Sequence, residues 1–143
     1  MKPYLLDINV LIALAWPTHV HHGGTQRWFA AHRAAGFRTC PLTQTGFVRI
    51  SSNSKFLPDA VSPLQALELL DRITSMSEHS FWPDDLTLRE TIGTGRILVG
   101  HRQISDAYLI ALAEQHGGIV ATLDRTMLST TSREGTVELL SGE

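Results

Sequence analysis

The chain has 143 residues, of which 43% are hydrophobic and 18% charged, a composition that fits one compact domain with a buried core and argues against global disorder. Its 12 Lys and Arg against 14 Asp and Glu give a formal net charge of -2, which disfavours nucleic-acid binding through bulk positive charge but leaves a local basic patch open. The single cysteine, Cys40, excludes an intrachain disulfide and a cysteine-rich zinc site, and it fits a reducing cytosol best.

The N-terminal stretch is apolar, but it does not resemble a membrane or export segment. No apolar run approaches the roughly 20 residues that a membrane helix needs, so no membrane association is expected. Asp7 and Asn9 stand in the middle of this stretch, where the core of a signal peptide would not normally hold an acid. A buried strand with a functional acid at its end is therefore the better interpretation.

The first half of the chain is expected to begin with a buried strand over residues 3–7 and an apolar helix over residues 10–16 that ends at Pro17. A helix over residues 23–35, which Gly36 ends, and a short strand over residues 37–40 follow. Thr43 is expected to cap a helix that runs to about Ile50. The polar, turn-rich residues 51–63 are interpreted as a connecting loop inside one domain.

In the second half, Pro63 begins the clearest amphipathic helix, which reaches Ile73. A strand over residues 79–82 and a short helix over residues 86–92 come next. Ser105 is expected to cap a centrally buried helix over residues 106–115, and strands are expected over residues 119–123 and 136–140. Strands alternating with helices predict a three-layer α/β/α sandwich around a parallel sheet of four to five strands.

Three aspartates are expected at one edge of this sheet, where the carboxyl ends of parallel strands form the functional crevice. Asp7 follows the first strand, and Asp124 follows the strand predicted over residues 119–123. Asp106 lies in the first turn of the buried helix. An unpaired carboxylate beside apolar segments is costly, and hard divalent cations prefer oxygen ligands. The acids therefore suggest a site for Mg²⁺ or Mn²⁺ that could polarise a phosphodiester and activate water.

Each acid also has a structural interpretation. Asp106 could interact with the positive end of its helix, and Asp124 could be a turn residue bonded to its own backbone. Asp7 has the weakest explanation of this kind, because it directly follows an apolar strand. Spacing alone leaves a shared metal site and separate structural roles equally open.

Four segments resemble the motifs of PIN domains, in the same order and at similar spacing. Residues 5–12 resemble the opening motif, residues 41–50 the second, residues 104–109 the third and residues 120–124 the fourth. The chain has the size of a VapC-type toxin, the ribonuclease of a bacterial type II toxin–antitoxin pair, and it is most similar to the mycobacterial-type branch. The resemblance implies a single PIN domain over residues 1–143.

This resemblance implies a cytoplasmic endoribonuclease that cleaves tRNA, rRNA or mRNA with Mg²⁺ or Mn²⁺. It also implies a homodimer and a cognate VapB-type antitoxin that inserts a segment into the active-site groove. By correspondence with the motifs, Asp7, Asp106 and Asp124 would be catalytic, with Asp7 and Asp106 as direct metal ligands. Asp124 would hold the metal through water or orient the attacking water. The supporting or substrate-binding positions would be Asn9, Gln44, Arg49 and Ser105.

One position departs from the family pattern. Gln44 stands where many PIN domains have glutamate, and an amide can offer an oxygen to a metal but carries no negative charge and cannot act as a general base. One alternative is therefore a catalytically weak or inactive PIN-like module that binds RNA or a partner. Another is a phosphatase-like α/β enzyme for small phosphoesters. RNA cleavage is favoured because the other three acids are intact.

The seven histidines invite a zinc interpretation, since histidine and carboxylates together can bind zinc. His19, His21 and His22 cluster near Pro17. No second histidine pair stands at the ligand spacing of a zinc helix elsewhere in the sequence, so a surface turn is the favoured interpretation.

Overall fold

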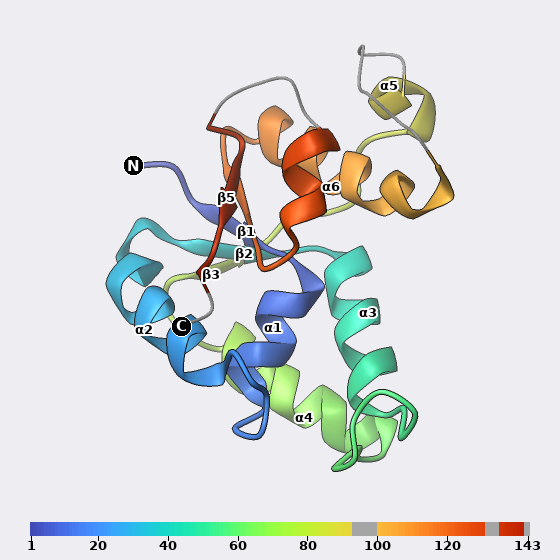
Figure 1. Cartoon of the computed structure of the whole chain (residues 1–143). Coiled ribbons are helices and arrows are strands. Elements are labelled where there is room, and N and C mark those ends of the chain that lie inside the picture. The colour runs from blue at the N-terminus through green and yellow to red at the C-terminus, as the bar shows by residue number, and fades with distance from the viewer. Residues whose placement is uncertain (93–99, 131–134, 142–143) are drawn as a thin grey trace.

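The computed structural model describes residues 1–92, 100–130 and 135–141. The strands are β1 (Tyr4–Leu6), β2 (Phe37–Thr39), β3 (His79–Phe81), β4 (Ile119–Thr122) and β5 (Val137–Leu139). They form one parallel sheet in the order β3-β2-β1-β4-β5 (Figure 1). The five predicted strands are confirmed, and each is one or two residues shorter than its hydrophobic run.

Helices cover both faces of the sheet, which confirms the predicted three-layer α/β/α sandwich (Figure 1). One face carries α1 (Ile8–Ala15), α2 (His22–His32), α3 (Pro41–Ser51) and α4 (Pro63–Thr74). The other face carries α6 (Ile104–Gln115), with α5 (Leu88–Ile92) packed beside it. The short 3₁₀ turns are Arg33–Ala35, His101–Gln103 and Arg125–Thr130.

Strand β1 lies at the centre of the sheet and is buried on both faces, because successive side chains of a strand point to opposite sides. Leu6 joins the core formed with α1 to α4, which includes Phe37 and Phe47. Leu5 joins the second core, which α6 shares through Leu109. Neither Leu5 nor Leu6 is exposed to solvent, so the residue that follows them, Asp7, is held between two packed layers.

Helix α6 is the central helix that the sequence predicts. Its residues 107–113 are all buried, so this helix has no solvent-facing side over two turns. The first turn that precedes these residues is more open, since Ser105 is exposed and Asp106 is half-buried. In the described part of the chain, no helix combines the length and the apolar character needed to cross a membrane.

The predicted caps of α3 and α6 are wrong by a few residues. Helix α3 begins at Pro41, whose fixed backbone angle suits a first helical position, and Cys40 is its cap residue. Thr43 contributes from inside the helix instead, where its hydroxyl accepts a hydrogen bond from the Cys40 amide at 3.0 Å. Helix α6 follows directly from a 3₁₀ turn, so Gln103 takes the cap position and Ser105 lies one residue inside the helix.

Helices α1 and α3 approach closely at Gly46. A glycine inside a helix is unfavourable by about 1 kcal/mol relative to alanine, so its presence in α3 needs a packing reason. A Cβ atom at Gly46 would overlap the side chain of Ile8, which is the first residue of α1 and the neighbour of Asp7. The absence of a side chain at Gly46 therefore lets α3 support the segment that carries Asp7.

We expect Gly46→Leu to lower the free energy of unfolding by about 1–3 kcal/mol, because the added side chain must displace Ile8 in a packed contact. The matched control is Gly23→Leu, since a Cβ at Gly23 in α2 meets only the end of the Arg27 side chain, at 3.4 Å. Urea unfolding of both variants measures the difference. Equal stability of the two variants would show that the contact between α1 and α3 is not tight.

Candidate functional site

The carboxyl ends of β1 and β4 lie side by side and bring Asp7 and Asp124 to the same edge of the sheet. Leu6 pairs with Ala121 in the parallel register, and the amide of Asp7 donates to the carbonyl oxygen of Ala121 at 2.9 Å. Asp106 comes to this edge from the first turn of α6. The three acids that the motifs single out thus come from β1, α6 and β4.

Asp7 is the most restrained of the three acids. Its carboxylate is 7% exposed, and it caps α1 because Oδ1 accepts the amide of Ile8 at 2.7 Å. Its other oxygen, Oδ2, accepts the hydroxyl of Thr122 at 2.7 Å. Burial raises the pKa of Asp7 and the nearby charge of Asp124 raises it further, while the hydrogen bonds from Thr122 and Ile8 lower it. The net shift is upward, so burial outweighs the two hydrogen bonds.

Thr122 connects the ends of both strands, and the motifs did not single it out. Its buried hydroxyl donates to Asp7 and accepts from Nδ2 of Asn9 at 3.3 Å and from the amide of Asp124 at 3.0 Å. Oδ1 of Asn9 in turn accepts the amide of Leu123 at 3.1 Å. A hydroxyl as the last residue of an otherwise apolar strand was the sequence signal for this role. Asn9 therefore positions Asp7 through Thr122.

The site also perturbs the ionisation of Asp106. Burial, followed by the charges of Asp7 and Asp124, raises its pKa from 3.8 to about 6. Such mutual effects require the three carboxyl groups to share one electrostatic environment. Among the described residues, none of the causes of the shifts at Asp7 and Asp106 is a basic side chain. Within the part of the chain that the structure describes, the acids therefore repel one another with no basic group acting on Asp7 or Asp106.

Asp124 combines a structural role with its place in this region. Its Oδ1 accepts the amide of Thr126 at 3.0 Å and the hydroxyl of Thr126 at 2.7 Å, so the turn interpretation of this residue applies to one oxygen. Its charge still contributes to the raised pKa values of Asp7 and Asp106. The two interpretations that the sequence left open for Asp124 are compatible.

The donor set fits a hard divalent cation that keeps part of its water shell. Within the described ranges, no three His, Cys, Asp or Glu side chains converge closely enough to hold a metal ion by themselves. Mg²⁺ is commonly held by only one or two carboxylates, together with waters and substrate phosphates. Carboxylates with raised pKa values and no described counter-charge suit such a cation, because it would relieve their repulsion.

The four supporting positions lie at different distances from the acids. Asn9 lies within the site, as its bond to Thr122 shows. Ser105 is exposed beside Asp106 at the start of α6. Arg49 is exposed on α3, five residues beyond Gln44, which corresponds to about 7.5 Å along the helix and a different side of it. A substrate-binding role for Arg49 therefore stays a prediction from the motif resemblance.

Gln44 takes part in a chain of hydrogen bonds at the end of β2. Its Nε2 donates to the hydroxyl of Thr39 at 3.0 Å, and this hydroxyl lies 2.8 Å from Nε2 of His79. Burial and the charge of Arg38 lower the pKa of His79, against a hydrogen bond to the backbone of Thr74. A neutral His79 that donates to Thr74 must accept at Nε2. The donors therefore run from Gln44 through Thr39 to His79.

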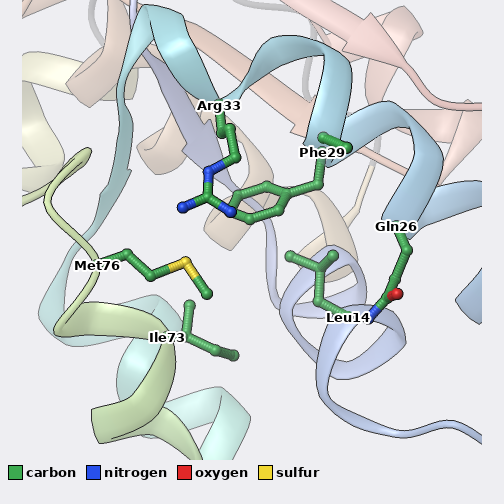
Figure 2. A pocket seen from close by; sticks show the side chains of 7 residues that line it. Leu14, Gln26, Phe29, Arg33, Ile73 and Met76 are labelled. Atoms are coloured by element: carbon green, nitrogen blue, oxygen red, sulfur yellow. The ribbon is translucent and has the colours of Figure 1, made fainter.

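Figure 2 shows a pocket that none of the three acids lines. It has a volume of about 230 Å³ and lies among α1, α2 and α4. Its walls are Leu14, Gln26, Phe29, Ala30, Arg33, Ile73 and Met76. None of these residues is an acid, so the acidic edge of the sheet is a separate region of the molecule.

The histidine cluster has local structural roles. Nδ1 of His22 lies 2.7 Å from the carbonyl oxygen of Ala13, and the amide of His21 donates to Nδ1 of His19 at 3.0 Å. These contacts organise the turn between α1 and α2, as the surface-turn interpretation expects. Within the described residues, these histidines do not converge with other ligands into a group that could hold a metal ion.

Comparison with known proteins identifies the family. The PIN domain model matches residues 4–132, which includes the three acids and the elements that carry them. The chain is also 44% identical to Ribonuclease VapC39 of Mycobacterium tuberculosis over 95% of this chain and 98% of that protein. The chain belongs to the VapC branch of the PIN domain family. Ribonuclease VapC38 of the same organism is 42% identical over 84% of each chain.

Solved structures show the same PIN fold. The structure of VapBC2 from Rickettsia felis bound to a promoter DNA fragment matches with a TM-score of 0.64 at 11% identity, over 96% of this chain and 98% of that one. The structure of PAE2754 from Pyrobaculum aerophilum matches with a TM-score of 0.59 at 22% identity, over 95% and 83% of the two chains. These proteins thus share the fold of this chain although few of their residues are identical to it.

The raised pKa of Asp106 predicts how the stability of this PIN domain depends on pH. Between pH 3.8 and about 6 the folded state binds more protons than the unfolded state, so the metal-free protein loses stability as the pH rises through this window. After allowance for its partial exposure, we expect Asp106→Asn to raise the free energy of unfolding at neutral pH by about 1–2 kcal/mol. Urea unfolding in EDTA at a series of pH values measures the free energy of unfolding of both proteins.

The matched control for this prediction is Asp71→Asn, since Asp71 is exposed on α4. This variant should show the same pH dependence as the unmodified protein. A flat stability profile between pH 4 and pH 6 in the unmodified protein would contradict the raised pKa of Asp106.

The hydrogen-bond chain of Gln44 predicts the effect of restoring the family glutamate. In Gln44→Glu, the Thr39 hydroxyl must donate to the carboxylate, so Nε2 of His79 needs a proton to remain bonded. We expect the pKa of His79 to rise and the free energy of unfolding to fall by about 1–2 kcal/mol. An NMR titration of His79 and urea unfolding provide the two measurements.

Gln65→Glu is the control for this substitution, because Gln65 uses only its oxygen, which accepts the amide of Ser62 at 3.0 Å. A glutamate can make the same bond, so its stability should change little. An unaltered His79 titration in Gln44→Glu would mean that the donor chain runs in the opposite direction.

Proposed function

We propose that the chain is the toxin of a type II toxin–antitoxin system, a single PIN domain over residues 1–143 that acts as a divalent-metal-dependent endoribonuclease. The observation that carries this proposal is the gathering of Asp7, Asp106 and Asp124 at one sheet edge, with raised pKa values at two of them. The name of a relative with 44% identity over nearly the whole chain, Ribonuclease VapC39, supports RNA as the substrate.

Asp7 and Asp106 are the carboxylates that would hold Mg²⁺ or Mn²⁺ in this proposal. When bound, such an ion polarises a phosphodiester and lowers the pKa of a water molecule. Asp7 is preorganised for this role, because Thr122 and the Ile8 amide hold its two oxygens in one orientation. Asp106 differs from Asp7 in that its protonation would respond to a bound cation. Its pKa is about 6, so an added positive charge would favour the ionised carboxylate near neutral pH.

Asp124 would orient the attacking water, or hold the ion through water. Its Oδ1 is bonded to Thr126, which fixes the side chain and leaves Oδ2 for this task. Thr122 and Asn9 are positioning residues, because they fix the backbone of β4 against the start of α1. Thr122 and Asn9 thus hold Asp7 and Asp124 in place without contacting the substrate themselves.

The partners in this proposal are a cognate VapB-type antitoxin, an RNA substrate and a second copy of the chain in a homodimer. The antitoxin is supported by the similarity to VapC proteins and by the Rickettsia felis structure, which is of VapBC2. A cytoplasmic location rests on the single cysteine.

A second candidate function is a weakly active or inactive PIN module that binds RNA or a partner. The observation that favours it is the role of Gln44, whose amide serves the Thr39 hydroxyl rather than supplying charge to the acids. This candidate predicts RNA binding without cleavage at any concentration of Mg²⁺ or Mn²⁺.

Metal-dependent cleavage of RNA tests the proposal. We expect the purified chain to cleave RNA with Mg²⁺ or Mn²⁺ and Asp106→Asn to lower the rate by at least about 100-fold, because it removes a proposed ligand and its charge. Asp71→Asn, on the exposed side of α4, should leave the rate unchanged. Mapping of RNA ends after induced expression in cells compares the same three proteins.

Two outcomes would contradict the proposed activity. Equal cleavage by the unmodified protein and Asp106→Asn would indicate a contaminating nuclease. Binding without cleavage across the full metal titration would favour the second candidate.

A further inference from the structure

A second pocket lies between the starts of α3 and α6. Its volume is about 190 Å³, and its walls are Leu42, Asp84, Leu88, Ile104, Ser105 and Tyr108. Ser105 precedes Asp106 in the first turn of α6, so the pocket borders the helix start that carries one of the three acids. The volume is below the ~300–1,000 Å³ of pockets for drug-sized ligands, which suits one planar base.

Asp84 supplies the charged wall of this otherwise mainly apolar pocket. Burial raises the pKa of its carboxyl group, and the neighbouring charge of Asp85 adds to this, while the nearby Cys40 thiol, Leu42 backbone and Tyr108 hydroxyl lower it. These neighbours come from both sides of the pocket. They restrain a carboxylate, which can only accept hydrogen bonds when ionised.

Tyr108 supplies a polar atom with unused capacity. Tyr108 is 8% exposed, and within the described residues its buried hydroxyl has no partner at good hydrogen-bond geometry, although the Leu86 backbone lies near enough to lower its pKa. The hydroxyl is nevertheless near Asp84, whose charge, after burial, raises the pKa of Tyr108. A buried hydroxyl without a well-aligned partner is unfavourable by about 1–3 kcal/mol, so a ligand that meets it would be favoured.

We propose that this pocket binds a guanine base of the RNA and so determines where the chain cleaves. The carboxylate of Asp84 and the hydroxyl of Tyr108 together present acceptors and a donor. Guanine is the base whose pairing edge carries two adjacent donors, N1–H and the exocyclic amine, beside an acceptor, O6. Adenine, cytosine and uracil each place an acceptor where a carboxylate would need a donor. Leu42, Leu88 and Ile104 would contact the apolar faces of the base.

This inference rests on the proposed function, because it assumes that RNA reaches the acids. It is tested by binding, which does not require cleavage. Fluorescein-labelled short oligouridines that contain one guanosine, inosine, 7-deazaguanosine or adenosine are titrated with the unmodified chain in Ca²⁺, and anisotropy is recorded. Inosine lacks only the exocyclic amine, whereas 7-deazaguanosine keeps the whole pairing edge.

We expect inosine and adenosine to weaken binding about tenfold relative to guanosine, since a hydrogen bond to a charged group is lost. The 7-deazaguanosine probe should bind as guanosine does. Asp84→Asn should lose about tenfold in affinity for guanosine and no longer distinguish it from inosine. Tyr108→Phe, which removes only the buried hydroxyl, should show a smaller loss in the same direction.

The control variant is Asp59→Asn, which removes an exposed acid from the loop before α4 and should keep the preference for guanosine. Equal binding of all four probes, no binding of any of them, or a preference that survives Asp84→Asn would each overturn the inference.

The two proposals fail separately. A preference for guanosine without metal-dependent cleavage would overturn the ribonuclease proposal and retain the pocket. Cleavage that Asp106→Asn abolishes, with no difference between guanosine and inosine probes, would retain the ribonuclease and overturn the pocket.

Discussion

The hydrogen bond from the Thr122 hydroxyl to the Asp7 carboxylate, 2.7 Å long, is the contact on which the acidic edge depends. It joins the end of β4 to the cap of α1 across the centre of the sheet. The same hydroxyl accepts from Asn9 and from the amide of Asp124, so one buried oxygen determines how two of the three acids are placed. An isolated carboxylate in this apolar setting would be strongly disfavoured.

The acidic edge opposes the stability of the fold. Burial and mutual repulsion raise the pKa values of Asp7 and Asp106, which means that the folded protein resists ionisation of groups that the unfolded chain ionises freely. The two cores on either side of β1 tolerate this because they bury β1 and α6 almost completely. A cation at this edge would convert the opposing charge into binding energy, which is the common logic of metal-dependent sites.

The motif and the fold describe the role of Gln44 differently. In the motif it is a missing negative charge, whereas in the fold it is a donor to Thr39 at the end of β2. The second description depends on His79, which is distant in sequence and reaches Thr39 only because β3 pairs with β2. The glutamine in place of the family glutamate is therefore hydrogen-bonded to the end of β2.

The sequence alone determined the order of strands and helices, the burial of α6 and the choice of Asp7, Asp106 and Asp124, because hydrophobic periodicity and strand-end acids are local signals. Only the tertiary structure decided that Thr122 and Asn9 hold Asp7 and that Thr122 also holds the amide of Asp124. Pairing register and helix packing set these features by joining residues more than 100 positions apart, as between Asp7 and Thr122. Such contacts have no local signature in the chain.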